Sequence, residues 1–223
     1  MKKNRVISII AIIALLLILA VAGIFAYLTS TDTASNKFTV GKVTIDLKED
    51  SWDDAPDTDN DGVPDFAENI VPNQTIAKDP KIKNTGENPA YVYLKVTVPV
   101  KKVVVANSDG TVSSRTPVDT ELFTYTKKSG WTEIESERGE VKDSSNNVTA
   151  HTYVYYYNTA LEKNAETTTL FDTVTFVNVI DNQVDAPGNY HVDVDAYAIQ
   201  SNNLSGNPTI PAAYSIYVNQ NNN

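Results

Sequence analysis

The sequence contains no cysteine among its 223 residues. Disulfide bonds, thiol nucleophiles and cysteine-ligated metals are therefore excluded, and stability must come from packing, strand pairing or bound ions. Sustained helical periodicity is almost absent as well. Basic residues are few, since 18 Lys and Arg stand against 28 Asp and Glu, which gives a formal net charge of −10. This acidity argues against nucleic acid or anionic lipid as a partner and favours cations.

The motifs of the common hydrolases are missing too. No His-Glu-x-x-His occurs, and the only two histidines, His151 and His191, lie too far apart in the chain for the i, i+4 zinc geometry of that motif. The sequence has no Gly-x-Ser-x-Gly elbow, no phosphate-cradling glycine loop and no plausible nucleophile–base pair. We therefore predict that the protein is not an enzyme.

The first 26 residues have the build of an export signal peptide. Lys2, Lys3 and Arg5 precede a nearly unbroken apolar run over 6–22. With the next three residues this run reaches the roughly 20 residues of a membrane span, so an uncleaved N-terminal anchor is the alternative, and it is the only membrane attachment that we expect. The Ala-Val-Ala triplet at 20–22 would suit a general signal peptidase. The sequence thus predicts a secreted protein.

The remaining chain is rich in Thr, Val, Tyr, Asn and Asp, a composition typical of all-β proteins. Strands are expected at 42–47, 71–76, 81–84, 91–98, 103–106, 122–126, 131–134, 152–158, 170–180 and 192–198. In the clearest of them Val92, Leu94, Val96 and Val98 should face a core, and Tyr91, Tyr93, Lys95 and Thr97 should face water. No crossover helices separate the strands. The pattern predicts a two-sheet, jelly-roll-like antiparallel β-sandwich with long decorated loops.

We divide the chain into four parts on composition. Residues 1–26 are the signal peptide, 27–38 an N-terminal leader or donor segment, and 39–218 one β-sandwich domain, with 219–223 as a disordered tail. Within the domain, residues 107–150 are more polar than a hairpin requires and are interpreted as a variable insertion. The segment 209–218 is either a short helix or a last strand.

The sharpest chemical motif is the acidic stretch 57–68, an insertion in the domain that matches the EF-hand-type calcium loop at every required position. Calcium prefers six to eight hard oxygen ligands, and the glycine at loop position 6 permits the sharp turn. The predicted ligands are Asp57, Asp59, Asp61, the carbonyl of Val63, Asp65 and Glu68. No helix is expected before the loop, unlike in an EF-hand. The ion would be structural and bound at about 10⁻⁴ to 10⁻³ M; a solvated acidic loop is the alternative.

Two further patterns have simpler interpretations that we favour. His191, Asp193 and Asp195 alternate along one expected strand and share a face, which could hold a metal, but a polar outer face explains them already. The tyrosines of 152–158 could form a carbohydrate-binding or stacking strip. The interpretation that we favour is a strand with one aromatic face in the core and one at the rim.

Three stretches together resemble the TasA/camelysin family of Gram-positive biofilm-matrix proteins. They are 26–41 with the following strand, AYLTSTDTASNKFTVG; the stretch from Val71, VPNQTIAKDPKIKNTGENPAYVYLKV; and 192–200, VDVDAYAIQ. The resemblance implies a jelly-roll fold, export through a dedicated signal peptidase and assembly into extracellular fibres. That peptidase would cut between Ala26 and Tyr27, and we favour this bond over the general cut after residue 22.

In similar proteins the mature N-terminal segment adds as a strand to the next subunit. The residues that this implies for the donor strand are Tyr27, Leu28, Thr29, Thr31, Thr33 and Ala34; a disordered leader is the alternative. Implied partners are other copies of the chain and an accessory matrix protein. Two other functions stay open: a monomeric, calcium-braced surface adhesin, and, more remotely, a metalloprotease such as the camelysins have been taken to be.

Overall fold

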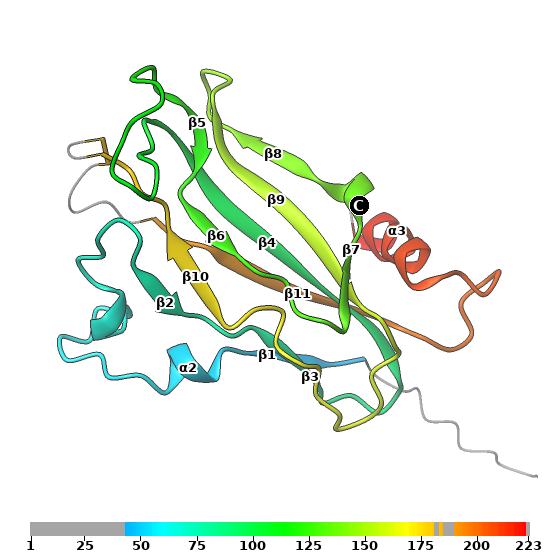
Figure 1. The fold of residues 1–223 in the computed structure, drawn as a ribbon. Helices are drawn as coiled ribbons and strands as arrows, with labels where there is room; N and C mark the ends of the chain where they lie inside the picture. The colour runs from blue at the N-terminus through cyan, green and yellow to red at the C-terminus, as the bar shows by residue number, and fades with distance from the viewer. Residues whose placement is uncertain (1–42, 181–182, 185–189, 222–223) are drawn as a thin grey trace, which may run out of the picture. The chain divides into compact units, whose positions relative to one another are not determined.

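The computed structural model describes residues 43–180, 183–184 and 190–221. Strands dominate these ranges, and every paired strand runs antiparallel to its neighbour (Figure 1). Within these ranges no helix is both long enough and apolar enough to cross a membrane. The all-β prediction is confirmed.

The larger sheet is ordered β11-β4-β9-β7, with β5 paired to β4 and β8 paired to β9. Its strands are β4 (Ala90–Val103), β5 (Val118–Glu121), β7 (Trp131–Glu133), β8 (Gly139–Lys142), β9 (Val148–Tyr157) and β11 (Asp193–Gln200). β4 is the longest strand. The four alternate apolar residues from Val92 to Val98 are fully buried, as the period-two pattern predicts.

Two smaller sheets form the opposite layer. One is ordered β2-β10-β6 and the other pairs β1 with β3. Their strands are β1 (Ile45–Lys48), β2 (Thr75–Ala77), β3 (Lys81–Asn84), β6 (Phe123–Tyr125) and β10 (Thr173–Phe176). One hydrophobic cluster joins side chains of all three sheets, including Leu94, Ile82 and Val174. The arrangement is an antiparallel β-sandwich whose core lies between the layers.

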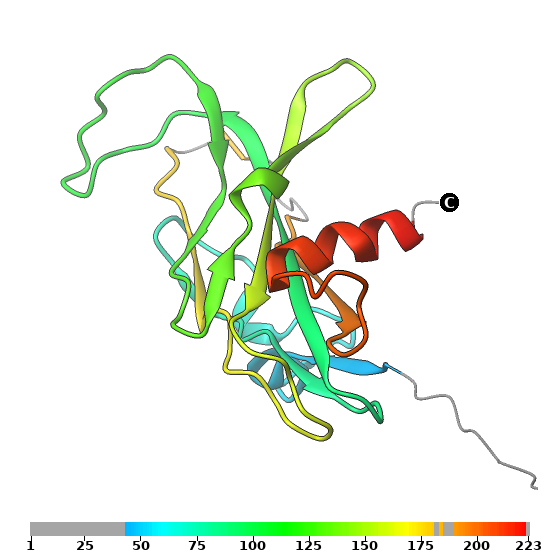
Figure 2. The ribbon, with the colours of Figure 1, turned by 90° about the vertical axis from the view of Figure 1, so that its right-hand side faces the viewer.

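A C-terminal helix covers the other face of the larger sheet. This helix, α3 (Ile210–Asn221), crosses the strands in Figure 2. Tyr93, expected to face water, is fully buried there, and its hydroxyl donates a hydrogen bond to the Ile210 carbonyl at 2.7 Å. The wet-face prediction is therefore wrong at Tyr93, because an apolar helix surface covers it. Of the two alternatives for 209–218, the structure has the helix, which also extends through residues 219–221 of the expected tail.

The segment 107–150 contributes more to the framework than its polar composition indicates. It supplies four of the strands, β5 to β8, and the short 3₁₀ helix η2 (Glu135–Glu137). Leu122, Phe123 and Trp131 from this segment are buried in the main core. The strands within this segment belong to both layers, because a few large apolar residues anchor an otherwise polar stretch.

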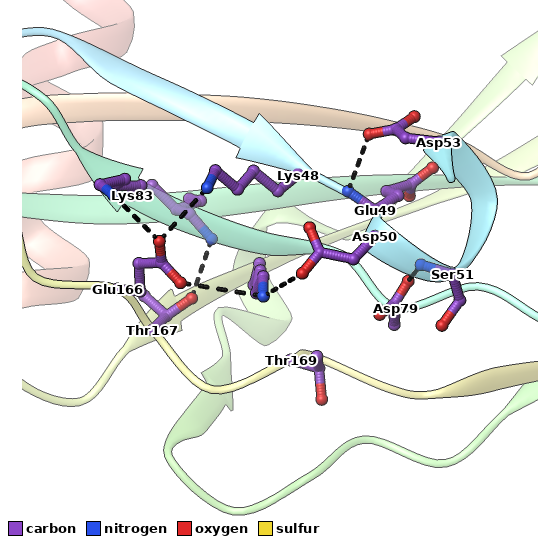
Figure 3. A network of polar contacts seen from close by, with 12 residues as sticks. Lys48, Glu49, Asp50, Ser51, Asp53, Asp79, Lys83, Glu166, Thr167 and Thr169 are labelled. Carbon is purple, nitrogen blue, oxygen red and sulfur yellow. Dashed lines mark hydrogen bonds and ion pairs between the residues drawn. The ribbon is translucent and has the colours of Figure 1, made fainter. Parts of the chain in front are cut away.

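Ion pairs fasten the small β1-β3 sheet to the loop that follows β9 (Figure 3). The carboxylate of Glu166 lies 3.3 Å from the ammonium groups of both Lys48 on β1 and Lys83 on β3. Lys81, also on β3, pairs with Asp50 at 2.6 Å. Asp50 begins the short helix α2 (Asp50–Asp53). These contacts position α2, and with it the chain that enters the acidic loop.

Candidate metal site and an open sheet edge

The acidic loop is held at both ends by aromatic contacts with the sandwich. Trp52 of α2 meets Phe66 edge to face, with ring centroids 5.9 Å apart. Phe66 belongs to the short 3₁₀ helix η1 (Asp65–Ala67), and both rings pack against the main core. The ammonium group of Lys78 lies 5.2 Å from the Trp52 ring centroid. The loop between α2 and η1 is therefore anchored on both sides.

Three carboxylates converge in this loop. Asp57, Asp59 and Asp61 each offer an oxygen, and these oxygens lie within 4.8 Å of one another. The turn that brings them together uses positive φ angles at Asn60 (59°) and Gly62 (89°), and such angles favour asparagine and glycine. Three like charges this close repel one another unless a cation neutralises them.

Hydrogen bonds within the loop orient these carboxylates. The amide of Gly62 donates to Asp57 Oδ2 at 3.0 Å, and the amide of Val63 donates to Asp61 Oδ1 at 2.8 Å. Asp57 Oδ1, by contrast, is buried and has no hydrogen-bond partner among the described residues. A buried carboxylate oxygen without a partner carries a large desolvation cost. The residues present fit a hard divalent cation, because such an ion would coordinate Asp57 Oδ1 together with carboxylate oxygens of Asp59 and Asp61.

Negative charge gathered in the acidic loop also affects the pKa of Glu68. Loss of hydration raises the pKa of Glu68, and the charges of Asp59, Asp61, Asp65 and Asp57 raise it further. All four acidic neighbours belong to the predicted ligand set. A bound cation would remove this repulsion and favour the ionised carboxylate of Glu68.

Asp65 closes the loop through its own contacts. Its carboxylate accepts hydrogen bonds from the Thr58 amide at 2.8 Å and from the Thr58 hydroxyl at 2.7 Å. These bonds hold the pKa of Asp65 below its usual range. Of the six predicted ligands, the structure groups Asp57, Asp59 and Asp61, places Glu68 within their electrostatic reach, and gives Asp65 a role in fixing the turn. The spacing of the motif contains no sign of the Thr58–Asp65 bond.

The histidines lie elsewhere in the structure. His191 is exposed just before β11, where Asp193 and Asp195 are exposed as well. His151 lies on β9, and its Nδ1 is 2.7 Å from the Glu121 carboxylate, which also accepts a short hydrogen bond from the Tyr153 hydroxyl. The Glu121 contact spans two strands of the larger sheet. Sequence reasoning missed it, because it depends on the register across β4.

The tyrosines of β9 divide between two environments. Tyr155 is buried in the main core, and its hydroxyl is 2.9 Å from that of Tyr125. Tyr156 packs on the opposite side, in the cluster covered by α3. The strand therefore has one aromatic face in the core, as the favoured interpretation predicts, but Tyr156 on its other face packs in the cluster covered by α3 and does not lie at the rim.

One long edge of the larger sheet is open within the described part of the chain. β11 pairs with β4 in uninterrupted register from Asp193–Thr97 to Gln200–Ala90. No other described strand pairs with β11. The predicted cleavage site at Ala26 and Tyr27 and the predicted donor residues lie outside the described residues.

The described residues thus form an antiparallel β-sandwich, with an acidic loop in which three carboxylates converge and a strand, β11, that pairs on one side only. Comparisons with protein-family models, with curated proteins and with solved structures give no match.

Proposed function

We propose that this chain is a secreted structural protein of a bacterial cell surface or biofilm matrix, and that it assembles into fibres by strand addition. The observation that carries the proposal is the open edge of β11. Among the described residues, the outer main-chain groups of this eight-residue strand have no strand partner. Natural proteins usually shorten, bulge or cover such an edge strand. An extended segment from another subunit would pair with these groups by β-augmentation.

The proposed donor is residues 27–38 of the next copy. Its length of twelve residues suits an acceptor strand of eight. Its composition, rich in Thr and with Tyr27 and Leu28 at its start, is compatible with an extended strand. The acceptor strand β11 leaves room for an added strand beside it, because its residues Ala196 and Ala198 are small and lie half-buried against the core.

We also propose that calcium binds the acidic loop and braces it structurally. Asp57, Asp59 and Asp61 would hold the ion, and Asp57 Oδ1 would gain a partner that the described part of the chain does not supply. The bound ion would fix the segment between α2 and η1, which contacts the sandwich through Trp52 and Phe66. The ion has no catalytic role in this proposal.

A calcium site would suit a monomeric surface adhesin as well as a fibre subunit. Whether the chain assembles into fibres therefore distinguishes these two functions. The test compares the chain from residue 27 onward with a variant in which 27–36 is replaced by a Gly/Ser segment of equal length. Both are concentrated with and without millimolar calcium and imaged by electron microscopy. Fibres that form only with the natural segment support strand addition. Dispersed particles from both proteins would reject the fibre function and favour the adhesin.

The calcium proposal has its own test, independent of assembly. Calcium at 100 times the dissociation constant should stabilise the folded chain by about 2.7 kcal/mol, which thermal unfolding detects. Asp57→Asn should remove most of this gain. Asp109→Asn is the matched control, because Asp109 is an exposed acidic residue whose carboxylate bonds only to nearby Thr111. An equal calcium response in Asp57→Asn and the unmodified chain would contradict the site.

A metalloprotease function has little support from the residues. The His-Glu-x-x-His motif is absent from the sequence. The imidazole of His151 is engaged by Glu121, and His191 is on a separate segment at the start of β11. We therefore propose a non-enzymatic function. Cleavage of casein by the purified chain that is abolished by a chelator would overturn this proposal.

A further inference from the structure

Tyrosines gather where α3 meets the larger sheet. Tyr197 on β11, Tyr93 on β4 and Tyr156 on β9 form one row, because Tyr93 is the register partner of both of the others. From α3, Tyr214 and Tyr217 lie against this row. Tyrosines of three neighbouring strands and of α3 therefore pack together on this face of the sheet.

The rings of three of these tyrosines are mutually close. The centroids of Tyr197 and Tyr217 are 5.3 Å apart with ring planes at 38°, and Tyr214 lies 6.5 Å from Tyr197 and 6.2 Å from Tyr217. Tyr93 and Tyr214 are close too, at 5.0 Å, but both are buried. Tyr197 and Tyr217 are half-buried, so the pair with the shortest separation among the accessible rings is Tyr197 and Tyr217.

We propose that Tyr197 and Tyr217 are a site of oxidative cross-linking, at which a one-electron oxidant such as a peroxidase with hydrogen peroxide joins them as dityrosine. Each phenol loses one electron and one proton to give a phenoxyl radical. The radicals couple through a new bond between the ring carbons next to the hydroxyl groups, and the two ring hydrogens then shift to oxygen, which restores both phenols. The net loss is two electrons and two protons, with which one hydrogen peroxide becomes two water molecules.

The surroundings suit this chemistry. Burial raises the pKa of Tyr197 to about 12, with a further contribution from the negative charge of Asp195. The phenol is therefore protonated near neutral pH, and its oxidation must release a proton together with the electron. Asp195 lies two residues before Tyr197 on the same face of β11, where its carboxylate is a local acceptor for that proton. The chain contains no cysteine to compete for the oxidant.

The cross-link would stabilise the folded chain by a covalent bond, as a disulfide does in other proteins. It would join the C-terminal helix to β11 and close a loop of about twenty residues, which restricts the unfolded chain. We expect the melting midpoint to rise by on the order of 5–10 °C. This inference concerns the outer face of the sheet and does not depend on calcium binding or on strand addition.

The test treats the folded chain from residue 27 onward with hydrogen peroxide and peroxidase, isolates the monomer and maps the product by mass spectrometry. No Lys or Arg follows Lys163, so trypsin leaves both tyrosines in one peptide. The expected product is that peptide lacking two hydrogen atoms, with no fragment ions from cleavage between residues 197 and 217. The monomer should also show dityrosine fluorescence.

Variants identify the pair. Tyr217→Phe and Tyr197→Phe keep the aromatic ring and should lose the cross-link and the rise in melting midpoint. Tyr91→Phe is the matched control, because Tyr91 packs against the same cluster but is in none of its ring pairs among the described residues; it should keep both. Coupling at other tyrosines, coupling only between chains, or an equal yield of the same product from the urea-unfolded chain would overturn the proposal.

Discussion

Removing the ammonium group of Lys78 should destabilise the fold strongly, because it breaks a largely buried ion pair. Lys78 Nζ lies 2.8 Å from Glu49 Oε2, and the two side chains are only 11% and 15% exposed. Glu49 Oε1 is buried and has no hydrogen-bond partner in the part of the chain that the structure describes. In Lys78→Met the Glu49 carboxylate would remain in place with no cation beside it.

The expected cost follows from this geometry. Breaking a buried pair by removing one partner costs about 3–5 kcal/mol, and the lost contact between the ammonium group and the Trp52 ring adds about 0.5–1 kcal/mol. Because both groups keep slight exposure, we expect a total near the lower end, about 3 kcal/mol. For a domain of this size that lowers the melting midpoint by about 6–12 °C.

Urea unfolding followed by tryptophan fluorescence measures this change. The control is Lys163→Met, which removes a pair with Glu87 whose side chains are 47% and 66% exposed; its expected cost is below about 1 kcal/mol. The double variant Glu49→Leu/Lys78→Met should recover most of the lost stability, because no unpaired charge remains buried. If Lys78→Met costs no more than Lys163→Met, the reasoning about this pair is refuted.

Three further changes have defined outcomes. Tyr93→Phe removes the hydroxyl that donates to α3 and should lower the free energy of unfolding by about 1 kcal/mol in a urea titration. Hydrogen bonds from lysines of β1 and β3 hold the pKa of Glu166 below its ordinary value of 4.5. Its stabilising contribution is complete above that value and is lost as the pH falls through the lowered pKa, so Glu166→Gln should flatten the acid side of a stability profile. Gly130 has φ +94° and an added Cβ would lie 3.1 Å from Thr168 and Tyr157 side-chain atoms, so Gly130→Ala should cost about 1–3 kcal/mol by thermal unfolding.

Alternation along single strands made the core predictable. Val92, Leu94, Val96 and Val98 are where the period-two pattern places them, and β3 has the predicted bounds, Lys81–Asn84. Period two tells which side chains share a face, but it does not tell what covers that face. The burial of Tyr93 beneath α3 was therefore out of reach, because tyrosine suits both a wet surface and an aromatic interface.

The candidate site was likewise predictable only where it depends on local sequence. The spacing of Asp57, Asp59 and Asp61 around Gly62 is a local property of the loop, and these carboxylates converge in the structure. The bond from Thr58 to Asp65 was not predictable, because it depends on how the loop closes against η1. The contact of Glu121 with His151 joins residues thirty positions apart, and only the register of three strands brings them together.

Hydrogen exchange along β11 tests the central proposal most directly. Strand addition predicts that the outward amides of 193–200 exchange far more slowly in the chain from residue 27 after assembly than in the chain from residue 39, while amides of the buried strand β4 are protected in both. Equal exchange of the β11 amides in the two samples would contradict donor-strand assembly at this edge.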